Sequence, residues 1–108
     1  MPRTRVVPLS PSTLELVQRM FGLRHRAQAV ALLEAECGAD LPFQEKASPE
    51  SLERIRFAVL QLASGSFAKL EQAIASAKQD WRDVLVAAGF GEDVDAHTAW
   101  ARRYLGGA

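Results

Sequence analysis

Apolar residues recur at intervals of three and four along most of the chain, which is the spacing that places them on one side of an α-helix. The pattern is clearest between residues 48 and 90. Ser48 followed by Pro49 predicts a helix start there, and Gly65 predicts its end. The apolar stripe expected for this helix comprises Leu52, Ile55, Val59 and Leu62.

Two further helices are expected in the same region. Ser66 is predicted to cap the first of them and Asp80 to start the second, which ends at Gly89 because glycine adopts the left-handed conformation without a Cβ clash. The first stripe comprises Phe67, Leu70, Ile74 and Ala77, and the second comprises Trp81, Val84, Leu85 and Ala88.

The N-terminal part of the chain predicts two more helices, separated by Gly22. The first starts at Ser10 or Ser12 and runs to about Phe21, and the second ends at Gly38. Their expected stripes are Leu14, Val17 and Phe21 in the first, and Leu23, Ala27, Val30 and Cys37 in the second. Residues 39–47 have no helical period and are expected to be a connector.

Beyond Phe90, Asp93 or Asp95 is expected to cap a last helix. One side of this helix would carry Val94, His97, Ala101, Tyr104 and Leu105. The sequence therefore predicts an all-α fold, a compact bundle of five or six short helices in a single domain. Residues 1–11, which contain three prolines, are expected to form an extended N-terminal arm, with the helical domain at 12–105.

Charge is balanced overall but unevenly distributed. Residues 1–30 contain five arginines and one glutamate, whereas residues 31–53 contain six acidic residues and one lysine. No apolar run is long enough to span a membrane, and the N-terminus lacks the apolar core of a secretory signal, so we expect a cytoplasmic protein with no membrane partner. The lone Cys37 is expected to be a buried thiol.

Two charged residues fall inside the apolar arcs of their helices. At 100° per residue, Arg56 and Glu34 both project inward, and a buried charge requires a partner. The candidates for an ion pair with Arg56 are Glu34, Asp80 and Asp83. The alternative is a pocket in which Arg56 binds an anionic ligand.

Aromatic residues and arginine in the second half of the chain are candidates for an interface, because these residue types dominate interaction hot spots. They are Trp81, Arg82, Trp100 and Tyr104. The alternative for residues 80–83 is a plain helix start, in which Asp80 caps and Trp81 packs inward.

Arginines near the N-terminus are the candidates for nucleic-acid contact. Arg24 and Arg26 lie near the start of the second helix, and Arg3 and Arg5 lie in the arm. Because the net charge is zero and no helix is strongly basic, nucleic-acid binding is the secondary hypothesis.

Catalysis has no support in the residue pattern. Neither His25 nor His97 has metal-ligand spacing to another ligand, and no glycine-rich phosphate loop is present. A Cys37–His97 nucleophile and base has no mark of activation. We therefore expect no catalytic residue, no cofactor and no metal.

Three segments, ALLEAECGADLPF, RIRFAVLQLASG and DWRDVLVAAGF, resemble short bacterial helical proteins to which no activity is assigned. The resemblance implies a bacterial, intracellular, compact helical domain. Together with the aromatic residues, the small size favours a protein-interaction domain that self-associates as a homodimer. The alternative is a DNA-binding regulator that uses the arginines of the N-terminal region.

Overall fold

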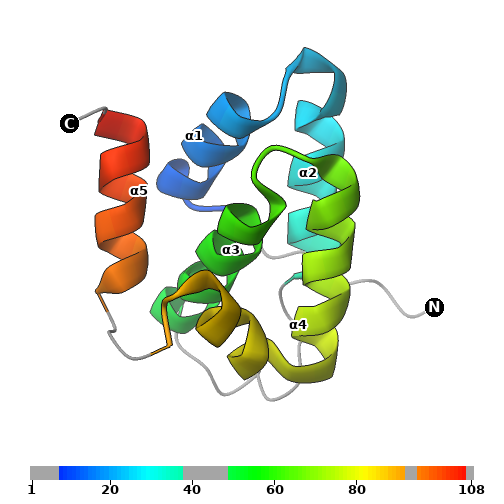
Figure 1. Ribbon diagram of the computed structural model, residues 1–108. Helices are drawn as coiled ribbons and strands as arrows, with labels where there is room; N and C mark the ends of the chain where they lie inside the picture. Colours follow the sequence, from blue (N-terminus) through cyan, green and yellow to red (C-terminus); the bar gives the residue numbers. More distant parts are fainter. Residues whose placement is uncertain (1–7, 38–48, 92–94, 107–108) are drawn as a thin grey trace.

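The computed structural model describes residues 8–37, 49–91 and 95–106, which form five α-helices and no strand (Figure 1). The predicted all-α bundle is confirmed. The helices are α1 Pro11–Met20, α2 Leu23–Glu36, α3 Pro49–Ala63, α4 Phe67–Ala88 and α5 Ala96–Gly106. Several predictions fall outside the described residues: residues 1–7 of the arm predicted over 1–11, the connector over 39–47, the Ser48 cap, and Asp93 and Val94. Pro11, the last residue of the predicted arm, is the first residue of α1.

Helix α3 lies at the centre of the bundle (Figure 1) and packs against α1, α4 and α5. Every residue from Ile55 to Leu60 is buried, so the middle of this helix is covered on all sides. The predicted single stripe is therefore too narrow a description. Ile55 and Val59 are fully buried as expected, whereas Leu52 and Leu62 at its two ends are only partly covered.

Helix α4 is bent at Asp80, whose backbone dihedrals of φ −159° and ψ 100° are not helical. The side chain of Asp80 accepts a hydrogen bond from the Arg82 amide at 3.1 Å, which is the geometry of a helix cap. The predicted helix start at Asp80 therefore appears as the break between two halves of α4. Gly89 ends the second half in the left-handed conformation, φ 84°, as predicted.

The buried side of α2 differs from the predicted stripe. The residues that pack inward are Ala29, Leu33 and Cys37, whereas Leu23 is 85% exposed and Ala27 is exposed. Alanines occur on several sides of this helix, so its own periodicity does not select one face. The contacts of α2 with α1 and α4 determine which of its sides is buried.

The first and last helices pack against each other at one side of the bundle. Ser10 caps α1 by accepting a hydrogen bond from the Thr13 amide. The side chains of Leu16 and Val17 in this helix are buried in the core. In α5, His97 and Ala101 are buried as expected, whereas Tyr104 is 42% exposed.

Candidate functional site

Arg56 is the charged residue in the buried middle of α3, where it is 3% exposed. Its guanidinium donates to the carbonyl oxygens of Cys37 at 2.9 Å, Pro8 at 3.0 Å and Leu33 at 3.5 Å. Two of these carbonyls lie at the C-terminal end of α2. The Leu33 oxygen also accepts a hydrogen bond from the Cys37 amide at 3.0 Å, whereas the Cys37 oxygen lies beyond the last helical hydrogen bond of α2. Arg56 therefore caps α2 and ties it to the segment that precedes α1.

Of the predicted ion-pair partners of Arg56, only Glu34 acts on its pKa. Burial lowers the pKa of Arg56, and this is opposed by Cys37 and by the carboxylates of Glu34 and Glu53. Asp80 instead forms an ion pair with Arg82, 3.1 Å between Nε and Oδ1. The structure thus brings Glu34 into the electrostatic surroundings of Arg56 and places Asp80 with Arg82.

Asp83, the remaining candidate partner, is exposed on the second half of α4.

Cys37 is fully buried at the end of α2. Desolvation raises the pKa of its thiol to about 12, although the positive charges of Arg56 and Lys78 act in the opposite direction. The thiol is therefore protonated at neutral pH. A protonated, buried thiol is a poor nucleophile and a poor metal ligand.

The histidines of the described chain lie against aromatic rings. His25 stacks on Phe67 with ring centroids 5.5 Å apart, and His97 lies 5.4 Å from Phe57 in an edge-on arrangement. Among the described residues, no group of three or more His, Cys, Asp or Glu side chains is placed to hold a metal ion. None of the described helices combines the length and the apolar character that crossing a membrane requires.

The four predicted interface residues lie on two different helices. Trp81 is half-buried at the start of the second half of α4, and the adjacent Arg82 is exposed. The ring of Trp100 on α5 has its centroid 5.8 Å from those of Phe90, which follows α4, and of Tyr104, which is also on α5. The role of these four residues in an interface stays a prediction.

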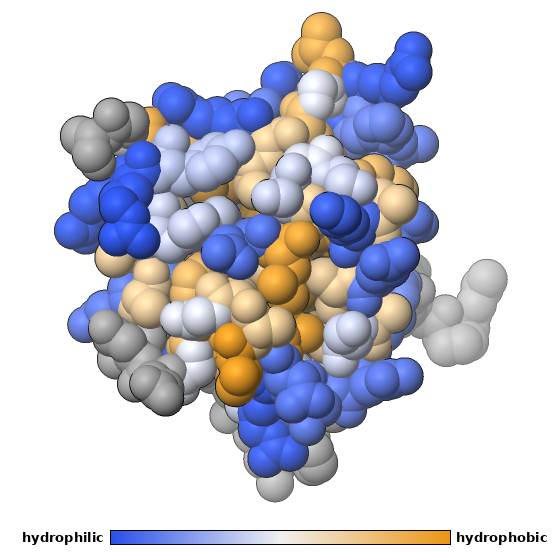
Figure 2. Space-filling view, viewed as in Figure 1, coloured by the Kyte–Doolittle hydropathy of each residue, from blue (hydrophilic) through white to orange (hydrophobic). Residues whose placement is uncertain are grey.

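Apolar side chains are exposed on a different surface, formed by α3 and α4. Figure 2 shows an apolar band down the middle of the viewed face, over α3 and the second half of α4, with hydrophilic residues on both sides. Val86, 69% exposed, and the half-buried Leu62 are large apolar side chains of these two segments that reach solvent.

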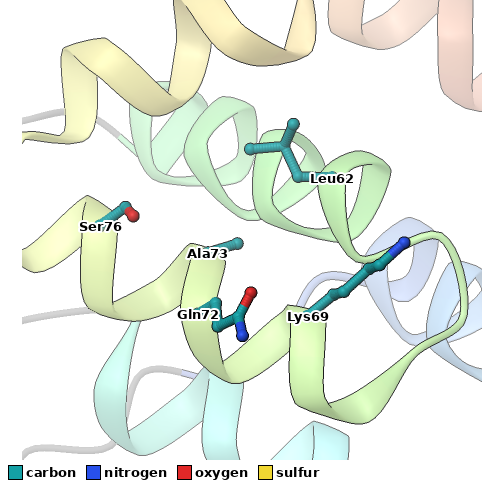
Figure 3. A pocket seen from close by; sticks show the side chains of 5 residues that line it. All are labelled: Leu62, Lys69, Gln72, Ala73 and Ser76. Atoms are coloured by element: carbon teal, nitrogen blue, oxygen red, sulfur yellow. The ribbon is translucent and has the colours of Figure 1, made fainter.

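An open groove of about 320 Å³ lies next to Leu62. Figure 3 shows that Leu62 comes from α3 and that the other lining residues come from successive turns of the first half of α4. Those residues are Lys69, Gln72, Ala73 and Ser76. We call this groove together with Val86 the α3–α4 face.

Sequence reasoning did not find this face. Lys69, Gln72 and Ser76 have the spacing of one helix side, but their partner Leu62 belongs to the expected core stripe. Only the packing of α4 against α3 shows that Leu62 is left partly uncovered.

Cationic side chains collect at one end of the bundle. This end holds the α1–α2 turn, the α3–α4 turn and the end of α5, and Figure 2 shows mostly hydrophilic residues along its edge. The cations are Arg19, Arg24, Arg26, Lys69, Arg102 and Arg103, and we call this region the basic end. The other nucleic-acid candidates, Arg3 and Arg5, lie outside the described residues.

Comparison with protein-family models, with curated proteins and with solved structures finds no match.

Proposed function

We propose that the protein is a self-associating interaction domain in which two copies pack through the α3–α4 face. The observation that carries the proposal is that apolar side chains are exposed on this face. Val86 is 69% exposed and Leu62 lies beside an open groove. Removing apolar surface from water stabilises an association by about 25 cal/mol per Å² before the costs of association are subtracted.

The rim of the groove is suited to a contact between identical copies. Lys69, Gln72 and Ser76 carry one charge and several hydrogen-bonding groups around an apolar floor, which is the usual layout of an interface. A two-fold symmetric contact uses the same patch on both copies, so each Leu62 would face the groove region of the partner.

The charge distribution supports an antiparallel arrangement of the two copies. The end opposite the basic end carries Glu34, Glu36, Glu53, Asp80, Asp83 and Asp95, together with Arg54, Arg56, Lys78 and Arg82. A two-fold axis across the middle of the face would bring the basic end of one copy beside this more acidic end of the other. Opposite charges in such an arrangement set the orientation of the partners more than the affinity.

Sedimentation equilibrium with two matched variants tests the proposal. Ser76 on the α3–α4 face and Ala99 on α5 are both exposed, so an arginine at either position is compatible with the fold. We expect the wild type and Ala99→Arg to have about twice the chain mass of 11.8 kDa. Ser76→Arg is expected to have the mass of a single chain, because it places a bulky charge in the contact.

Circular dichroism of both variants controls for loss of fold. A wild type that has the single-chain mass at every concentration contradicts the proposal. A disruption by Ala99→Arg with no effect of Ser76→Arg would also contradict it, because the contact would then lie on α5.

A further inference from the structure

Helix α2 buries few of its residues in the bundle. Of its fourteen residues, only Ala29 and Leu33 are buried. The exposed positions are Leu23, Arg24, Ala27, Gln28 and Ala31. The helix is therefore attached to the bundle along a narrow side and presents most of its first half to solvent.

The exposed face of α2 carries residue types that read base pairs. Arg24 and Gln28 are four residues apart and lie on one side of the helix. Arginine pairs with the N7 and O6 acceptors of guanine, glutamine pairs with adenine, and alanine contacts the thymine methyl group. No acidic residue occurs between Leu23 and Ala31 that would repel phosphate.

Cations flank the start of α2 on both sides. Arg19 lies in the last turn of α1, which is joined to α2 through Phe21 and Gly22, and Lys69 lies in the first turn of α4. The stacking of His25 on Phe67 holds the starts of α2 and α4 together. Side chains on the elements beside a recognition helix are the ones that contact the phosphates on either side of a groove.

The acidic groups near this region are few and exposed. Glu15 pairs with Arg19 at 3.3 Å, with both side chains about half exposed, and Glu71 is exposed on α4. An exposed ion pair of this kind is worth little and exchanges readily with a phosphate. The first turn of α2 itself has no acidic residue and no side-chain cap that would offset its positive charge.

We infer that α2 enters the major groove of duplex DNA, with Arg24 and Gln28 at the base edges and Arg19 and Lys69 on the flanking phosphates. B-form DNA is the partner, because the major groove of A-form RNA is too narrow for a helix. The exposed side of α2 lies outside the α3–α4 face, whereas Lys69 belongs to both, and the basic end lies beside the other copy in the antiparallel arrangement proposed above. The DNA-binding test therefore rests on Arg24 and Gln28, which the α3–α4 face does not include, so that its failure is distinguishable from a failure of the self-association.

Fluorescence anisotropy with a labelled mixed-sequence DNA duplex tests the inference. The affinity is expected to fall with salt, with a slope of about −2 in log K against log salt concentration, as roughly two phosphate contacts require. Arg24→Glu is expected to weaken binding about tenfold or more. The matched control Arg82→Glu changes the net charge equally at the other end of the molecule and is expected to change binding by less than about twofold.

Insertion into the groove is tested separately by dimethyl sulfate, which methylates guanine N7 in the major groove. We expect bound protein to protect N7, and Gln28→Ala to reduce the preference between duplexes of different sequence. Circular dichroism confirms the fold of each variant.

The inference is overturned if the duplex does not bind at low salt, or if both glutamate variants weaken binding equally. Unchanged N7 reactivity in the complex overturns it as well, since contact would then be confined to the phosphates. Binding to vesicles of anionic lipid with none to the duplex would instead assign the basic end to a membrane surface.

Discussion

At the scale of single residues, Arg56 shows how a buried charge is accommodated in a small core. Removing a guanidinium from water is costly unless its donors are satisfied. Arg56 donates to three backbone carbonyls from two segments of the chain, Pro8 before α1 and Leu33 and Cys37 at the end of α2. One side chain thereby connects the N-terminal segment, the end of α2 and the central helix.

The replacement of Arg56 by either lysine or methionine is expected to lower the free energy of unfolding by about 3 kcal/mol. Lysine keeps the charge but cannot reach several carbonyls with its single ammonium, and methionine removes the side-chain donor from the Pro8 and Cys37 carbonyls. Urea denaturation of both variants measures the effect. A lysine variant as stable as the wild type would mean that the charge alone is important and that the carbonyl contacts are not.

The buried thiol of Cys37 makes the free energy of unfolding depend on pH in the alkaline range. Because burial raises the pKa of the folded thiol to about 12, the folded chain holds the proton more tightly than the unfolded chain, where the ordinary value is 9.0. This contribution is fully present below pH 9, declines as the pH rises above 9, and is lost near pH 12. The slope reaches up to about 1.4 kcal/mol per pH unit.

The Cys37→Ala variant is the control for this pH effect. It is expected to lose less stability than the wild type between pH 8 and about 10.5. The two proteins are compared by the slope of the free energy of unfolding against pH, because the smaller alanine side chain lowers the stability of the variant at every pH. Parallel pH profiles for the two proteins would contradict the assignment.

At the scale of elements, the bend of α4 at Asp80 sets the path of its second half. The Asp80 carboxylate accepts hydrogen bonds from the amide and the guanidinium of Arg82. These hydrogen bonds lower the pKa of Asp80. The cap is therefore present above the ordinary pKa of the carboxylate and is lost as the pH falls through the lowered value.

Asp80→Ala is expected to lower the melting temperature and to increase amide hydrogen exchange in the first turn after the bend. Asp80→Asn is expected to resemble the wild type near neutral pH, because an asparagine oxygen can accept the same amide hydrogen bond. Thermal melts and hydrogen exchange measure both effects. Equal loss in the two variants would show that the charge of Asp80, and not its capping oxygen, supports the bend.

Helix ends were predictable from the sequence, and helix faces were predictable only in part. Ser66, Asp80 and Gly89 mark boundaries because capping and left-handed conformations depend on the local residue type. The buried side of α2 was predicted only in part. Cys37 is buried as expected, but Leu23 and Ala27 are exposed, because the alanines of α2 are similar on several sides and neighbouring helices select among them. The inward orientation of Arg56 was predicted, but its carbonyl partners depend on tertiary packing.

At the scale of the whole molecule, two surfaces have features of binding sites. The α3–α4 face is apolar at its centre, whereas the basic end and the exposed side of α2 are cationic and polar. Neither surface follows from composition, because the formal net charge is zero. The uneven distribution of charge along the chain indicates a basic N-terminal part, but only the packing of the helices brings Lys69, Arg102 and Arg103 to the same end as Arg19 and Arg24.

Two-dimensional NMR of the isotope-labelled protein at a low and a high concentration tests the central claim of self-association most directly. We expect the amide shifts that change with concentration to cluster on the α3–α4 face, at Leu62, Lys69, Gln72, Ala73, Ser76 and Val86. Shifts that do not change with concentration, or changes that centre on Trp100 and Tyr104, would contradict the claim.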